Sequence, residues 1–332
     1  MLHNRTIAAS GARSSGDDAG ADVAIAEQAT DYKEAARLAT LAFGTPTVHF
    51  SPEHLQWFYE RSFSLGSVVV ALRSGDRKVG QFTLVKQSVR MNGIVESAVQ
   101  LVDLFILKEF RSRARLQMLY DEVERQCRKA NIRFAIGMPN ARAVRTNEHF
   151  LKLMPWLWLE VRSGFAVRTA SSASIESMPF DPARRNEIVA KLSRFETSLG
   201  DNGLEWDGKR LYDRLCGFKF KYGLHMSEHG LLISSSRIWR GFNYTLLCGF
   251  LSQTGVTLPQ SEVRALVRAA CRMWHHPLFV YAGLNTSLAV MPGVRIPGRL
   301  RPSLMLMQLR DFAPDKGPVR FDRYQLIDFD FA

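Results

Sequence analysis

The chain has 332 residues, of which 46% are hydrophobic and 23% are charged. That balance is typical of globular proteins with a sizeable core and excludes disorder over the whole length. At about 150 residues per domain, the length favours two domains. The 44 Lys and Arg residues against 32 Asp and Glu residues give a net charge of +12. Phosphate-bearing cofactors, nucleic acids and membrane surfaces all suit such a charge, so charge alone does not choose a partner.

The apolar runs of the sequence fall far short of the roughly 18 residues that a membrane-spanning helix requires, so we expect no membrane span. The four cysteines form no C-x-x-C pair: they are Cys127, Cys216, Cys248 and Cys271. This argues against a disulfide framework and a zinc cluster, and it favours a reducing, cytoplasmic location. Residues 1–21 are rich in Gly, Ala, Ser and Asp and lack the apolar stretch of an export signal, so we expect a disordered tail.

The first half, residues 22–168, predicts alternating strands and helices. We expect a strand at 23–26, a helix at 31–43 with Asp31 as its N-cap, and a second helix opened by Ser51 and Pro52. Strands follow at 67–72, 79–89 and 98–107. Residues 115–130 form an amphipathic helix in this prediction, because apolar residues recur every three or four positions. A strand at 132–138, a helix at 141–153 and a strand at 156–167 complete the half.

Residues 169–185 are rich in Ser, Ala and Pro, which predicts a linker to a second domain at 186–332. Cys127-Arg128 and Cys271-Arg272 each end an amphipathic helix, and similar strands follow them at 134–140 and 279–285. This repeat indicates a duplication, although any two helix–strand units can share such a pattern by chance. The alternation of Asp328, Phe329, Asp330 and Phe331 predicts a final strand whose aspartates face solvent or pair with arginines.

A short basic loop follows the strand at 98–107. Lys108, Arg111, Arg113 and Arg115 lie within eight residues, directly before the long helix. A helix start offers unsatisfied backbone N–H groups and the positive end of the helix dipole, and the small residues Ser112 and Ala114 would let a phosphate approach. The loop therefore predicts a pyrophosphate site. A solvated basic turn is the alternative.

The segment Arg111-Ser-Arg-Ala-Arg-Leu116 resembles the Arg/Gln-x-x-Gly-x-Gly/Ala signature of the GNAT superfamily of acyl-CoA N-acyltransferases. Ala114 and Leu116 stand at the two small positions, so Leu116 would have to point away from the ligand. Gly137-Met-Pro-Asn140 and Leu151-Lys-Leu-Met-Pro-Trp156 are similar to further patterns of some bacterial members. The resemblance covers residues 22–168 and extends weakly to 332. It implies an α/β fold of two tandem GNAT-like domains, each a mixed, largely antiparallel sheet flanked by helices.

The resemblance also implies the site. The strand before the basic loop bulges and splays from the next strand, so that its backbone can pair with the pantetheine of acetyl-CoA or another acyl-CoA. The acyl carbonyl would then lie against a backbone N–H of Leu104, Phe105 or Ile106. The pyrophosphate would lie at the loop residues Arg111, Ser112, Arg113, Ala114, Arg115 and Leu116.

Two further residues are candidates for catalysis. Asp103, on the bulging strand, is the candidate general base, and a structural pairing with an arginine is the alternative role. Asn140 either orients the substrate or caps the next helix. We expect no metal, because the histidines at 225, 229, 275 and 276 lack matching acidic or Cys ligands.

The function that follows is N-acyl transfer, most simply N-acetyl transfer, to the primary amine of a small molecule. An amino sugar is suggested by analogy alone, and amino acids and polyamines stay open. The alternative is a catalytically degenerate CoA-sensing or interaction module, because Ala114 and Leu116 depart from the signature and no general acid is evident. Nucleic-acid binding ranks last, since the sequence has no recognition-helix, RRM or OB pattern.

Overall fold

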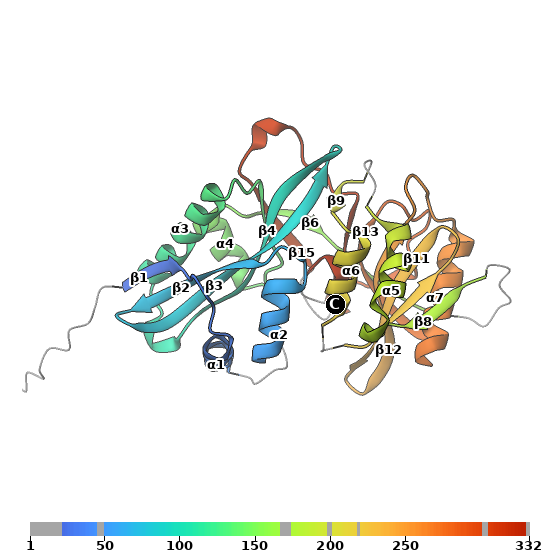
Figure 1. Cartoon of the computed structure of the whole chain (residues 1–332), viewed down its shortest axis with the longest axis horizontal. Helices are drawn as coiled ribbons and strands as arrows, with labels where there is room; N and C mark the ends of the chain where they lie inside the picture. Colours follow the sequence, from blue (N-terminus) through green and yellow to red (C-terminus); the bar gives the residue numbers. More distant parts are fainter. Residues whose placement is uncertain are drawn as a thin grey trace, which may run out of the picture.

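The computed structural model describes residues 22–44, 50–166, 174–197, 201–217, 220–300 and 305–329. The expected tail at residues 1–21, and the start of the expected linker at residues 169–173, lie outside the described residues. A mixed, largely antiparallel sheet flanked by helices dominates the molecule (Figure 1), which confirms the predicted α/β fold class.

The first half opens with a strand, two helices and a three-stranded meander. Asp31 caps the first helix as predicted, since its side chain accepts hydrogen bonds from the N–H groups of Lys33 and Glu34. Ser51 caps the second in the same way. The elements are β1 (Asp22–Ala26), α1 (Tyr32–Phe43), α2 (Pro52–Gln56), the π-helical turn η2 (Trp57–Arg61), β2 (Ser67–Ser74), β3 (Arg77–Met91) and β4 (Ile94–Ile106).

A parallel crossover follows the meander. The chain passes through η3 (Lys108–Phe110) and α3 (Arg113–Lys129) into β5 (Phe134–Gly137), which lies parallel to β4. The apolar face of α3, which includes Leu119, Val123 and Cys127, packs on the sheet residues Val79 and Phe82. The half ends with α4 (Ala143–Leu151), β6 (Met154–Trp158) and β7 (Glu160–Phe165).

The second half contains a similar crossover, in which β12 (Phe242–Ser252) leads through α7 (Gln260–Trp274) to the parallel strand β13 (Leu278–Asn285). Figure 1 places α7 and α3 at opposite ends of the molecule. The other elements are β8 (Glu176–Pro179), η4 (Pro182–Arg184), α5 (Arg185–Leu192), η5 (Ser193–Phe195), β9 (Gly203–Leu204), α6 (Gly208–Leu215), β10 (Tyr222–Met226), β11 (Gly230–Trp239), β14 (Val294–Arg295), η6 (Gly298–Leu300), β15 (Leu306–Asp311), η7 (Pro314–Lys316), β16 (Arg323–Gln325) and η8 (Leu326–Asp328).

Strand pairing crosses the boundary that the sequence suggested between residues 168 and 186. β15, from near the end of the chain, lies between β5 and β6 of the first half. In return, β7 pairs with β13 of the second half. β8, which lies inside the expected linker, pairs with β10. The sheet is also continuous through β16 and β9 to β3, so the two halves share one set of backbone hydrogen bonds.

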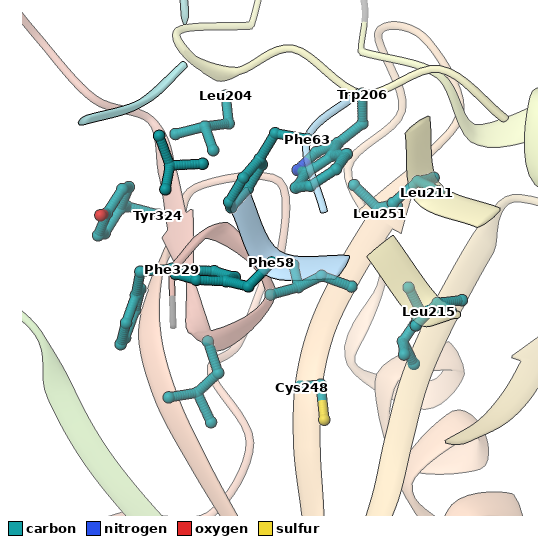
Figure 2. Packing of buried hydrophobic residues seen from close by; sticks show 14 of the residues in the cluster. Phe58, Phe63, Leu204, Trp206, Leu211, Leu215, Cys248, Leu251, Tyr324 and Phe329 are labelled. Carbon is teal, nitrogen blue, oxygen red and sulfur yellow. The ribbon is translucent and has the colours of Figure 1, made fainter. Parts of the chain in front are cut away.

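A shared core joins the halves. Phe58 and Phe63 from the first half pack with Trp206, Tyr324 and Phe329 from the second (Figure 2). The rings of Tyr324 and Phe329 stack, with centroids 5.4 Å apart.

The predicted solvent-facing strand at 328–331 is wrong where the structure describes it. Asp328 lies in η8 and is fully buried. The indole Nε1 of Trp206 and the backbone N–H of Gln325 donate to the Asp328 carboxyl at 2.7 and 2.6 Å. Burial nevertheless raises the pKa of Asp328, because it penalises the charged form.

Candidate active site

A bulge in β4 shapes the site. Thr83 of β3 pairs with Val102 and Gln81 pairs with Phe105, so Asp103 and Leu104 together lie opposite one residue of β3. Asp103 has φ 52°, in the left-handed region that few residues other than Gly adopt and that Asp tolerates better than most. A bulge of this kind bends its strand and frees backbone groups from the ladder.

The bend opens β4 from β5. Their last paired residues are Leu101 and Gly137, and beyond this point the strands separate. A cavity of about 280 Å³ lies at the opening. The residues that surround it include Asp103 and Leu104 from the bulge, Gly137, Asn147 and Phe329. Phe329 brings the second half of the chain to this cavity. The bulge and the splay that the resemblance implied are therefore both present.

Asp103, the candidate base, lines this cavity. The phenol of Tyr59 donates a hydrogen bond of 2.6 Å to its Oδ2 atom. Gln81 in turn donates to the Tyr59 oxygen, with 2.9 Å between Nε2 and Oη. The carboxylate is thus held from one side while it borders the cavity.

A second, larger cavity of about 850 Å³ forms a groove next to the first, and Phe43, Leu104, Asn140 and Ala143 border both. The starts of α3 and α4 meet at this groove. Ser112 caps α3 by accepting from the N–H of Arg115, and Asn140 accepts from the N–H groups of Arg142 and Ala143. Two helix N-termini therefore direct their positive dipole ends and first N–H groups toward one groove.

The groove is rich in guanidinium groups and, among the described residues that line it, contains no Asp or Glu. Arg111, Arg113, Arg142 and Arg145 all border it. Arg113 donates to Nε2 of His149 at 2.9 Å, and since a guanidinium only donates, His149 accepts through that nitrogen. This concentration of positive charge fits a ligand with several phosphates.

The structure separates the residues predicted to contact pyrophosphate. Arg111, Ser112 and Arg113 line the groove, whereas Ala114 and Arg115 do not. Arg115 instead forms a bidentate ion pair with Asp22, at 2.8 and 3.1 Å. Leu116, which we expected to point away from the ligand, is among the residues that border the groove.

Arg111 has a structural role besides bordering the groove. Its Nε donates to the carbonyl of Ile106 at 2.9 Å, and its terminal nitrogen donates to the carbonyl of Ala42 at 3.2 Å. These bonds tie the basic loop to the end of β4 and to α1.

Asn140 borders both cavities, and its side-chain oxygen accepts from the N–H groups of Arg142 and Ala143 in the turn that leads into α4. Phe105 and Ile106 are paired with β3 and border the groove, whereas Leu104 lies in the bulge and borders both cavities. Leu104 is thus the best placed of the three predicted backbone donors.

Sequence reasoning missed the groove residues at the N-cap of α4 and within it. Arg142, Arg145 and His149 lie three and four positions apart, so they share one face of a helix, and this periodic basic face was the signal that could have found them. Gln100 and Asn147, which border the smaller cavity, carried no such signal, because single amides are common in any helix or strand.

The corresponding opening of the second half is filled by the chain itself. β12 and β13 are last paired at Leu247 and Tyr281, and β16 then pairs with β13 from Gly283 to Asn285. A Cβ atom on Gly249 of β12 would lie 2.8 Å from the side chain of Ile327. This close packing leaves no room there for a ligand like the one that the first half can accept.

Residues 25–147 match the family model for the acetyltransferase (GNAT) domain. The match identifies a GNAT acetyltransferase domain in the first half of the chain. No curated protein sequence matches the chain significantly. Within the described residues, no helix is long and apolar enough to cross a membrane, and no group of three His, Cys, Asp or Glu side chains could hold a metal ion.

Solved structures share the fold of most of the chain. A probable N-acyltransferase from Enterococcus faecalis superposes with a TM-score of 0.63 at 12% identity, covering 88% of this chain and 73% of that one. A GCN5-related N-acetyltransferase from Anabaena variabilis gives 0.59 at 10%, covering 87% and 72%. The N-myristoyltransferase of Saccharomyces cerevisiae, solved with myristoyl-CoA, gives 0.52 at 10%, covering 92% and 83%. The GNAT-like fold therefore extends beyond residue 147.

Proposed function

We propose that the protein is an N-acyltransferase that moves a short acyl group, most simply acetyl, from acyl-CoA to the primary amine of a small molecule. One observation carries the proposal. The bulge at Asp103 lies where a small cavity meets a basic groove, so a carboxylate, the bulged backbone of β4 and an anion site adjoin one another.

Acyl-CoA fits the groove by chemistry. The arginines at 111, 113, 142 and 145, together with the N-termini of α3 and α4, would hold its phosphates. When bound, acyl-CoA supplies a thioester whose carbonyl carbon accepts the amine. The cavity beside the bulge, at about 280 Å³, is suited to a short acyl group.

The chain's own groups would assist the transfer in two ways. The N–H of Leu104, a residue of the bulge that borders both cavities, would stabilise negative charge that develops on the thioester oxygen. Asp103 accepts a proton from the amine nitrogen while the new C–N bond forms and the C–S bond breaks. Solvent returns a proton to the thiolate, because Asp103 and His149 are, apart from arginines, the titratable side chains among the described residues that border the cavities.

Titration calorimetry with acetyl-CoA, desulfo-CoA and ADP tests the co-substrate. Thiol release from acetyl-CoA with a panel of amino sugars, amino acids and polyamines tests the reaction. We expect micromolar binding and at least one productive amine, and we expect Asp103→Asn to lower the rate by about 100-fold or more. Asn tolerates the left-handed backbone as Asp does, so this variant isolates the charge. A full rate in Asp103→Asn would assign proton removal to water.

A degenerate CoA-sensing module is the second candidate, and one observation favours it: the described residues that border the cavities provide no evident proton donor for the thiolate. This candidate predicts acetyl-CoA binding without thiol release from any amine. A single productive amine excludes it.

A further inference from the structure

Tyr59 reaches Asp103 from a distorted turn of helix. The N–H of Ser62 donates to the carbonyl of Trp57, five residues earlier, at 3.0 Å, which makes η2 a π-helical turn. Such turns are rare and occur frequently at functional sites. The side chain of Tyr59 is buried at 1% exposure, and its phenol donates to Oδ2 of Asp103 at 2.6 Å.

Gln81 of β3 fixes the direction of that hydrogen bond. Gln81 is also 1% exposed, and its Nε2 donates to Tyr59 Oη at 2.9 Å and to Thr83 Oγ1 at 3.0 Å. A phenol has one proton. Because the Tyr59 oxygen accepts from Gln81, its own proton is available for Asp103, and the chain of donation runs from Gln81 through Tyr59 to the carboxylate.

Neither Tyr59 nor Gln81 is among the residues that border the two cavities. Both therefore act behind Asp103, on the side away from substrate. Asp103 itself lies at a strained backbone position, where a hydrogen bond from a rigid, buried ring restricts the rotation of the short side chain.

We infer that Tyr59, oriented by Gln81, is a positioning residue that holds the Asp103 carboxylate in the bulge for proton acceptance from the amine. This inference rests on the proposed function and deepens it, because it assigns the group that makes the base effective. It also explains why a π-helical turn stands directly before the buried strands: the turn sets the phenol of Tyr59 at the bulge.

The test compares Tyr59→Phe with Tyr212→Phe. Tyr212 is a buried tyrosine of α6 whose phenol donates to the carbonyl of Pro182 at 2.8 Å, so the control removes the same oxygen far from the site. With the most active amine of the panel, we expect Tyr59→Phe to lower kcat about tenfold, which is less than the roughly 100-fold or more expected when the base itself is removed. The affinity for acetyl-CoA, measured by calorimetry, stays within twofold in both variants, and Tyr212→Phe keeps the wild-type kcat.

Two further measurements separate positioning from a general loss of structure. Methoxyamine is uncharged at neutral pH and has less need of a base, so Tyr59→Phe should impair its acetylation less than that of an ordinary alkylamine. The double variant Tyr59→Phe, Asp103→Asn should be no slower than Asp103→Asn alone, because groups that act as one unit are not additive. Gln81→Leu should reproduce the Tyr59→Phe defect in part.

Equal losses with both amines, multiplicative losses in the double variant, or a wild-type rate in Tyr59→Phe would each overturn the inference while leaving acyl transfer in place. A wild-type protein that acetylates no amine removes the proposed function, and the positioning role with it. Acetyl-CoA binding without turnover would identify that second outcome.

Discussion

The side-chain amide of Gln325 satisfies both backbone hydrogen-bonding groups of Phe250. Its Oε1 accepts from the Phe250 N–H at 2.8 Å, and its Nε2 donates to the Phe250 carbonyl at 2.9 Å. Tyr281 and Asn285 of β13 donate to the same Oε1 atom, at 3.0 and 3.5 Å. Gln325 therefore closes the opening between β12 and β13 from within, at the place that corresponds to the β4–β5 opening of the first half.

Removing this amide should destabilise the protein strongly. In Gln325→Leu the Phe250 N–H and the Tyr281 hydroxyl lose this acceptor in fully buried positions, whereas the Phe250 carbonyl keeps the hydrogen bond from Asn285 at 3.0 Å. Each buried unsatisfied group costs about 1–3 kcal/mol. We expect the free energy of unfolding in urea to fall by about 2–4 kcal/mol. Gln260→Leu, at the exposed start of α7, serves as the control and should change it by less than about 0.5 kcal/mol. Equal stabilities for the two variants would contradict the role of Gln325.

The basic face of α4 should determine affinity for the phosphates of CoA. The double variant Arg142→Gln, Arg145→Gln removes two positive charges from the groove wall. We expect the Kd for acetyl-CoA to rise about tenfold or more, and the salt dependence of binding to weaken. The matched control is Arg264→Gln, Arg272→Gln on exposed positions of α7, which makes the same charge change far from the groove. Equal weakening by both pairs would indicate a nonspecific effect of net charge.

The predicted elements of the first half lie close to those of the structure because their signals are local. Asp31 and Ser51 cap helices through their own side chains, and the apolar repeat of Leu119, Val123 and Cys127 faces the sheet. The exchange of β7 and β15 between the halves has no local signal. The hydrophobic pattern of a buried strand does not depend on which strand it pairs with. Periodicity therefore could not assign β15 to the first half.

In the site, too, local sequence patterns could not predict contacts between residues that are far apart in the chain. The basic loop and Asp103 were visible in the sequence because charged residues clustered around one predicted helix start. Arg115 does not border the groove with the other residues of this cluster. Its Nε instead donates to Oδ2 of Asp22, 93 residues earlier, at 2.8 Å. The support of Asp103 by Tyr59 comes from a residue 44 positions away, so only the folded chain brings the pair together.

The exchanged strand β15 should couple the two halves in unfolding. Gln308 of β15 is fully buried, accepts from Asn147 at 2.9 Å, and donates to the carbonyls of Val144 and Leu153. In Gln308→Leu these groups lose their partner, and we expect a loss of about 2–5 kcal/mol in a single cooperative transition. Met307→Leu, a size-conserving change at the next buried position, should cost less than about 1.5 kcal/mol. Two separate transitions, with only one shifted, would show that the halves unfold independently.

Stability should also fall on mild acidification because of His225. This histidine of β10 is fully buried and lies between Ser177 of β8 and Ser234 of β11, 2.9 and 2.8 Å from its two ring nitrogens. Burial lowers the pKa of His225 to about 4, below its value near 6.5 in the unfolded chain. The unfolded state therefore binds more protons between these two pKa values, and the stability present above pH 6.5 is lost as the pH falls toward 4.

The loss attributable to His225 between pH 6.5 and 5 should be about 1–2 kcal/mol. Burial also lowers the pKa of His54 to about 4, so the wild-type protein carries a second contribution of the same sign. The measurement is urea unfolding at several pH values for wild type and for His225→Gln, whose neutral amide can donate and accept as the neutral imidazole does. We expect the variant to lose less stability over this range, and Gln260→Leu, an exposed change that removes no titratable group, to keep the wild-type slope. A slope unchanged in His225→Gln would show that the imidazole is already protonated in the folded state or does not titrate in this window.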